Sequence, residues 1–133
     1  MVDDPFWKGL VTPLPAPAHA DERGVLTSVA FAPHDFRVVR AFTVVAPDGA
    51  VRGGHGHHRG RQILLRVGGE IHVEVRRDGR VLELSLGPDV PGLLIESGVW
   101  ARQTYSGPDA ALVVFCDTEY DVDDYFSGPE ASS

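Results

Sequence analysis

The sequence is short of cysteine, of basic side chains and of long apolar runs, and each shortage excludes a class of protein. Cys116 is the single cysteine, so no internal disulfide forms and a disulfide-scaffolded secreted domain is excluded. Twelve Lys and Arg stand against 19 Asp and Glu, a formal net charge of −7, so no general attraction to nucleic acid or anionic lipid is expected. No stretch approaches the roughly 20 apolar residues that a membrane span needs.

The beginning of the chain shows no targeting signal. Residues 1–10 contain Asp3, Asp4 and Lys8 and lack the apolar core of a secretory signal peptide. A single thiol suits a reducing compartment, so we expect a cytoplasmic protein. The length of 133 residues predicts one domain, 1–133, with an irregular arm at 1–20 that includes Pro13, Pro15 and Pro17 and a flexible tail at 126–133.

Short apolar runs separated by turn residues predict strands. The 15 Gly and 10 Pro fall between these runs, and no helical period of useful length is present. The clearest signal is a hairpin in which 70–77 and 80–86 alternate apolar and polar residues around Asp78-Gly79. The other expected strands are 25–31, 37–45, 62–67, 93–96, 100–105 and 111–117. Together they predict an all-β, antiparallel double-sheet jelly roll.

The densest chemical feature is the run Arg52-Gly53-Gly54-His55-Gly56-His57-His58. In a strand, His55 and His57 share one face because side chains alternate with period two, whereas His58 points the other way. Two imidazoles on one face suit either a metal site or proton transfer, since the reference pKa of histidine is about 6.5.

The metal interpretation lacks ligands. Cupin barrels commonly combine His-x-His with a carboxylate some four residues later and a late histidine, but Gln62 and Ala101-Arg102 occupy those places here. An amide is a poor ligand for a divalent transition metal, and two imidazoles leave the ion under-coordinated. A metal cupin that uses His55, His57 and a third ligand such as Gln62 or His58 is kept as an alternative.

A wider set of residues, from about 21 to 125, resembles the cupin sugar 3,4-ketoisomerases that act on thymidine-diphosphate 4-keto-6-deoxyhexoses, which are related to WxcM-like domains. The matching pieces are Asp21-x-Arg23-Gly24, Arg40, Arg52-Gly53-x-His55-x-His57, Gln62, Asp78-Gly79, Gly92-Leu93, Val99-Trp100, Tyr120-Asp121 and Asp124-Tyr125. The resemblance implies a homodimeric cupin jelly roll without metal or other cofactor. It also implies a nucleotide-diphosphate sugar as partner, and neither nucleic acid nor membrane.

The resemblance also implies roles for individual residues. A base removes the C3 proton of the hexose, an enediol forms, and a proton is delivered to C4, giving the 3-keto sugar. His57 is expected to be the principal base and His55 to polarise or shuttle. The expected substrate-binding residues are Arg23, Arg40, Arg52, Gln62 and Trp100, with the arginines holding the diphosphate. Trp100 is also expected to pack within the barrel.

The chain departs from the family at two neighbouring positions. Relatives usually have tyrosines where this sequence has Phe42 and Thr43, which leaves a non-catalytic sugar-nucleotide-binding cupin as a further alternative. Near the end of the chain, a run of carboxylates lacks the glycine and final glutamate of a calcium loop, so it is predicted to be acidic surface. Its members are Asp117, Glu119, Asp121, Asp123 and Asp124.

Overall fold

Ten strands and two short 3-10 helices make up the part of the chain that the computed structural model describes, residues 2–16 and 18–128. The strands are β1 (Val11–Leu14), β2 (Ala18–Asp21), β3 (Gly24–Thr27), β4 (Arg40–Ala46), β5 (Val51–His57), β6 (Gln62–Arg77), β7 (Arg80–Leu86), β8 (Gly92–Ile95), β9 (Trp100–Cys116) and β10 (Tyr125–Phe126). The 3-10 helices are η1 (Ala32–His34) and η2 (Val122–Asp124). Every strand pairing is antiparallel.

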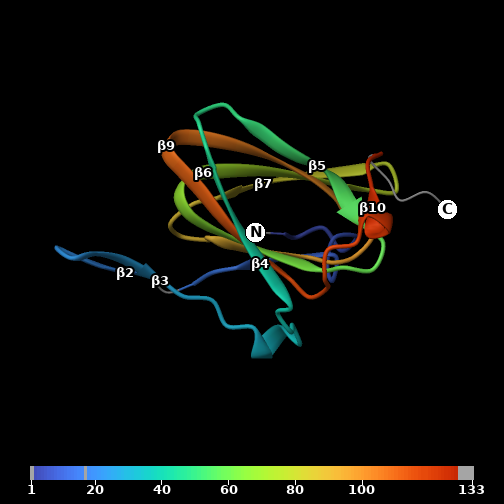
Figure 1. Ribbon diagram of the computed structural model, residues 1–133, viewed down its shortest axis with the longest axis horizontal. Helices are drawn as coiled ribbons and strands as arrows, with labels where there is room; N and C mark the ends of the chain where they lie inside the picture. Colours follow the sequence, from blue (N-terminus) through green and yellow to red (C-terminus); the bar gives the residue numbers. More distant parts are fainter. Residues whose placement is uncertain (1, 17, 129–133) are drawn as a thin grey trace.

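Two long strands, β6 and β9, run from one layer of the barrel into the other (Figure 1). In one layer the strand order is β1-β8-β6-β9-β4, and in the other it is β7-β6-β9-β5-β10. One half of β6 and one half of β9 belong to each layer. Register shifts on either side of Gly68 allow β6 to bend between the layers. The predicted all-β jelly roll is therefore confirmed.

The core lies between the two layers and is formed by the apolar residues that alternate with polar ones along the strands. Ile71, Val73 and Val75 of β6 are fully buried, while the residues between them face the outside. The predicted hairpin forms with the expected register, Arg77 opposite Arg80, because Asp78 and Gly79 both adopt positive φ.

The prediction of an irregular arm over 1–20 is wrong in part. Residues 11–14 form β1 and pair with β8, and Trp7 is buried in the main core with 1% exposure. At the other end, Phe126 belongs to β10 and is buried, so the predicted tail cannot start there; residues 129–133 lie outside the described part. Both segments are held by packing of aromatic side chains against the barrel, which proline content alone does not reveal.

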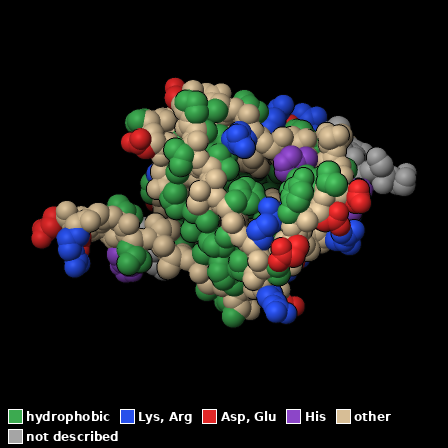
Figure 2. All heavy atoms as spheres, in the orientation of Figure 1, with side chains coloured by type: hydrophobic (Ala, Val, Ile, Leu, Met, Phe, Trp, Pro, Cys, Tyr) green, Lys and Arg blue, Asp and Glu red, His purple; other side chains and the backbone are tan. Residues whose placement is uncertain are grey.

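The hairpin β2–β3 stands apart from the barrel. It projects away from the other strands (Figure 1), and its two strands pair only with each other. Val25 and Leu26 are 69% and 60% exposed, and apolar atoms lie beside charged ones on the projection in Figure 2. An isolated two-stranded hairpin with exposed apolar side chains is marginal in water, so a partner surface is expected to cover it.

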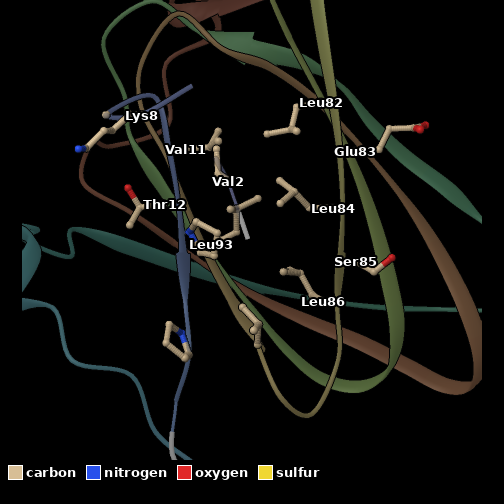
Figure 3. A pocket seen from close by; sticks show the side chains of 14 residues that line it. Val2, Lys8, Val11, Thr12, Leu82, Glu83, Leu84, Ser85, Leu86 and Leu93 are labelled. Atoms are coloured by element: carbon tan, nitrogen blue, oxygen red, sulfur yellow. The ribbon is translucent and has the colours of Figure 1, made fainter. Parts of the chain in front are cut away.

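The side of the barrel between the edge strands β1 and β7 is open. A cavity of about 570 Å³ lies there, into which Leu82, Leu84 and Leu86 point, while Glu83 and Ser85 point away (Figure 3). The cavity contains no histidine and shares no lining residue with the pocket of the histidine motif. Across the described residues, no helix is long and apolar enough to cross a membrane.

Candidate active site

The histidine motif lies on β5, where a β-bulge turns the side chains of Arg52 and His55 toward the barrel interior. Gly53 and Gly54 adopt φ of +82° and +81°, and the register between β5 and β9 shifts between Gly53 and His55. The extra residue brings Arg52 and His55 onto one face, although a regular strand would separate them. Both line a small pocket between the two layers.

The two imidazoles lie edge to face. The ring centroids of His55 and His57 are 5.6 Å apart, with an interplanar angle of 89°. Tyr125, which is opposite His57 in the β5–β10 pairing, contacts both rings, at centroid distances of 4.9 Å to His55 and 4.4 Å to His57. The alternation predicted for His55 and His57 is thus confirmed, and His58 contacts Phe126 on the other side.

Burial keeps both histidines in their neutral form near pH 7. It lowers the pKa of His57 to about 4, with the positive charges of His55 and Arg40 adding to this effect and the carboxylate of Asp124 opposing it. Burial also lowers the pKa of His55. A neutral imidazole can accept a proton, so the pair is prepared to act as base at neutral pH.

A row of polar residues crosses the first layer beside the histidines. Arg40, Cys116 and Gln62 are paired across β4, β9 and β6, and the Cys116 Sγ is 3.5 Å from both the Arg40 Nη2 and the Gln62 Nε2. The Arg40 guanidinium lies near the rings of Phe42 and Tyr120, at 5.4 and 5.7 Å from their centroids. This arrangement places a cation at the side of the His pair.

Several buried polar atoms of this region have no hydrogen-bond partner among the described residues. They include Arg40 Nε, His55 Nδ1, His57 Nε2 and Tyr105 Oη. Most buried polar atoms in proteins are satisfied, because an unpaired one costs about 1–3 kcal/mol. His55 and Tyr105 line the pocket of the histidine motif, so a polar ligand bound there would complete the hydrogen bonds of these two residues.

The opposite wall of the pocket is apolar. Phe42 and Val44 of β4 line it together with Leu64, Leu112 and Val114, in a partly open pocket of about 80 Å³. Of the two departures from the family, Phe42 therefore faces the pocket, whereas Thr43 is exposed and is not part of its lining.

Two of the predicted substrate-binding residues lie elsewhere. Arg23 is on the projecting hairpin, where it pairs with Asp21 at 2.7 Å and its side chain is 85% exposed. Trp100 is 7% exposed and sits next to Arg76 and Arg102, on the face of β9 opposite Ala101. Arg40, Arg52, Gln62, His55 and His57 are the predicted residues that the fold brings together.

The sequence reasoning missed two neighbours of the histidines. Tyr125 was noted as a motif residue without a role, and Asp124 was predicted to be surface acid. That prediction is wrong: Asp124 is 2% exposed, because its carboxylate accepts hydrogen bonds from the backbone amides of Arg59 and Gly60. Only the pairing of β10 with β5, residues far apart in sequence, brings both to the site.

The donor set does not fit a metal ion. Within residues 2–16 and 18–128, no group of three or more His, Cys, Asp or Glu side chains is close enough to hold one. The groups beside His55 and His57 are an amide, a guanidinium and a phenol ring, which are poor partners for a transition metal, and the carboxylate of Asp124, whose two oxygens accept the backbone amides of Arg59 and Gly60.

Comparison with known proteins decides the family. The model of the family described as "FdtA: WxcM-like, C-terminal" matches residues 11–131. The chain belongs to this family. No curated protein matches its sequence significantly.

Solved structures with the same fold include relatives of known activity. QdtA, a sugar 3,4-ketoisomerase from Thermoanaerobacterium thermosaccharolyticum solved with TDP, has a TM-score of 0.78 at 23% identity and covers 89% of this chain and 88% of its own. A 3,4-ketoisomerase from Helicobacter canadensis has a TM-score of 0.77 at 21% identity, over 88% of this chain and 90% of its own. The rmlC epimerase of Mycobacterium tuberculosis has a TM-score of 0.76 at 17% identity, over 94% of this chain and 70% of its own. These likenesses establish the fold that the FdtA family member shares with them.

Proposed function

We propose that this FdtA family member is a sugar 3,4-ketoisomerase that moves the keto group of a thymidine-diphosphate 4-keto-6-deoxyhexose from C4 to C3, in deoxysugar biosynthesis. The observation that carries the proposal is the neutral pair of the partly buried His55 and the buried His57 beside Arg40, each with an unpartnered polar atom. Structural relatives named as TDP-sugar 3,4-ketoisomerases support it. The reaction only relocates hydrogen within the sugar, so it needs no oxidant or reductant.

The proposed reaction starts at C3. A neutral histidine takes the C3 proton, the electrons of that C–H bond form the C3=C4 double bond, and the C4 oxygen accepts negative charge or a proton. Return of a proton to C4, with loss of the proton on the C3 hydroxyl, gives the 3-keto sugar. Arg40, whose Nε is buried and unpartnered, would stabilise the charge that develops on oxygen.

The division of labour between the histidines is part of the proposal. The resemblance to the 3,4-ketoisomerases favours His57 as principal base, and the low pKa of His57 keeps it deprotonated. His55, however, lines the pocket directly, whereas His57 is not among the residues that line it. His55→Asn and His57→Asn separate the roles: the variant of the principal base loses conversion almost completely, while the other retains a measurable rate.

The apolar pocket wall supports a 6-deoxy substrate. A methyl group at C6 can pack on Phe42, Val44 and Leu64, whereas a C6 hydroxyl would be buried there without a partner. Arg52, which also lines the pocket, would hold an anionic part of the nucleotide.

We further propose a homodimer in the cytoplasm. The exposed apolar side chains of β2–β3 support it, because a second subunit would cover them. Arg23 lies on this hairpin, away from its own barrel (Figure 1), so a role for Arg23 in binding the diphosphate requires that the hairpin reach the other subunit.

The test is conversion of thymidine-diphosphate 4-keto-6-deoxyglucose by the purified protein, alongside binding of thymidine diphosphate measured as thermal stabilisation. Formation of the 3-keto product supports the proposal. Stabilisation without product identifies a binding module, and a stoichiometric metal found by elemental analysis of protein purified without chelator, with activity lost on its removal, identifies a metal cupin.

A further inference from the structure

Asp124 ends η2 and is buried directly beside the active-site histidines. Its exposure is 2%, and together with His57 and Glu74 it belongs to the few buried polar or charged residues among those described. Glu74 is paired with Arg76 and Arg102 on the outer face of the sheet. The nearest cation to Asp124 is the Arg59 guanidinium, whose Nε is 3.8 Å away and whose side chain is 64% exposed. Asp124 is therefore a buried carboxylate without a buried ion-pair partner.

The hydrogen bonds of Asp124 fix the turn that follows β5. Its Oδ1 accepts the Arg59 amide at 2.7 Å and its Oδ2 accepts the Gly60 amide at 3.0 Å. The backbone carbonyl of Asp124 accepts the His58 amide at 2.8 Å. Three consecutive amides after His57 are thus held by one residue. Because His57 is the last residue of β5, this clamp restricts the backbone that carries its ring.

The same residue places the aromatic ring that covers the histidines. Tyr125 follows Asp124 directly, pairs with His57 and contacts both imidazoles. The charged and titratable groups around His57 are His55 on β5, Arg40 on β4, Tyr125 on β10 and Asp124 on η2. Burial, His55 and Arg40 all lower the pKa of His57, and Asp124 is the group that raises it. An imidazolium formed during the reaction would therefore have Asp124 as its counter-charge.

We propose that Asp124 is a positioning residue of the active site, which holds the turn after His57 and stabilises the protonated form of that ring during proton transfer. The inference rests on the proposed isomerase function, because it assigns Asp124 a role in the proton transfer that His57 carries out. It concerns a residue that contacts the histidine strand rather than the sugar.

The test compares Asp124→Asn with Asp124→Glu and with Asp121→Asn. Asp121 is the matched control, because it caps the same 3-10 helix through the Asp123 amide and pairs with the same arginine at 2.8 Å, but its side chain is 43% exposed. Two readouts are used: the ring signals of His57 followed by NMR from about pH 8 to about pH 3.5, and kcat and KM for the nucleotide sugar.

The proposal predicts that His57 of the wild type begins to titrate at the acid end of this range. In Asp124→Asn the titration moves down by about one unit, beyond the range, because the counter-charge is gone. kcat falls roughly ten-fold or more while KM changes little, since the loss lies in proton transfer and ring placement. Asp124→Glu restores the titration and part of kcat, and Asp121→Asn behaves as the wild type.

Unchanged His57 titration and unchanged kcat in Asp124→Asn would overturn the proposal, as would equal effects of Asp121→Asn. If Asp124→Asn fails to fold, Asp124→Glu decides: a lowered kcat in folded protein supports positioning, and wild-type kinetics contradicts it. The NMR readout needs no turnover. An inactive wild type whose His57 still responds to Asp124→Asn refutes the isomerase function and not the positioning, whereas an active enzyme without this response refutes the positioning alone.

Discussion

Arg52 and His55 project from the same face of β5 although three positions separate them, and the bulge at Gly53 and Gly54 is the cause. Without the extra residue, the cationic side chain and the imidazole would lie on opposite faces of the sheet. The bulge is thus the local backbone feature on which the composition of the pocket depends.

The bulge can be tested with Gly53→Ala. Gly53 has φ of +82°, and an added Cβ would lie 2.6 Å from the Gln103 Oε1 and 3.1 Å from the Ala101 carbonyl oxygen. We expect a loss of about 1–3 kcal/mol in the free energy of unfolding and a fall in kcat/KM of about ten-fold or more, because Arg52 and His55 move. Urea denaturation and steady-state kinetics measure both.

Gly87→Ala is the matched control. Gly87 has no positive φ, and an added Cβ would meet no heavy atom within 4 Å. We expect wild-type stability and kinetics. Wild-type kinetics in Gly53→Ala as well would contradict a role of the bulge in forming the site.

Burial of His57 predicts a particular acid sensitivity. The folded pKa is about 4 against 6.5 for the free side chain, so between these values the unfolded chain binds more protons and folding weakens as the pH falls. His57→Gln removes this contribution. Between pH 7 and pH 5 the wild type should lose about 1–2 kcal/mol more unfolding free energy than the variant, as measured by urea denaturation. Equal losses would show that His57 is not buried in its neutral form.

The hairpin β2–β3 predicts an oligomeric state. The double variant Val25→Glu, Leu26→Glu places charges on the exposed apolar side chains of the hairpin, so it should convert a dimer into a monomer at micromolar concentration, as seen by light scattering. Val81→Glu, at a 50% exposed position on β7, should leave the dimer intact. A monomeric wild type would contradict the proposed homodimer.

Arg61 links the segment around η1 to the barrel. Its guanidinium donates to both carboxylate oxygens of Glu96 at 2.9 and 3.2 Å and to the backbone carbonyls of His34 and Asp35. Arg61→Met should cost about 1–2 kcal/mol of unfolding free energy, because these partly buried groups lose their donor. Arg77→Met, which removes a 3.9 Å pair with the exposed Asp78 and one 3.4 Å hydrogen bond to the Ser97 carbonyl oxygen, should cost less than about 1 kcal/mol. Equal costs would exclude a structural role for Arg61.

Local rules predicted much of the barrel from the sequence. Alternating residues and the Asp78-Gly79 turn predicted the hairpin of β6 and β7, because both features act between neighbours. The sequence predicted two separate strands at 62–67 and 70–77, yet β6 runs through Gly68 and Gly69 between them, since a bulge absorbs the irregular residues and lets the strand change layer. Glycine spacing alone does not distinguish a turn from a bend within one strand.

The part of the site that lies within one short sequence motif was predictable. His55 and His57 share a face by simple alternation, and their common location is confirmed. Asp124 was not predictable, because its burial depends on amides more than sixty positions earlier in the chain. Arg52 reaches the same face through a bulge that a period of two does not describe.

The central claim, that the His pair transfers a proton at C3 of a 4-keto sugar, is tested most directly by proton NMR in deuterated buffer. Wild type is incubated with thymidine-diphosphate 4-keto-6-deoxyglucose beside the double variant His55→Asn, His57→Asn. The account predicts deuterium incorporation at the reacting carbons and a 3-keto product with the wild type, and neither with the variant. An unchanged substrate spectrum with saturated wild-type protein, or equal exchange in the double variant, would contradict it.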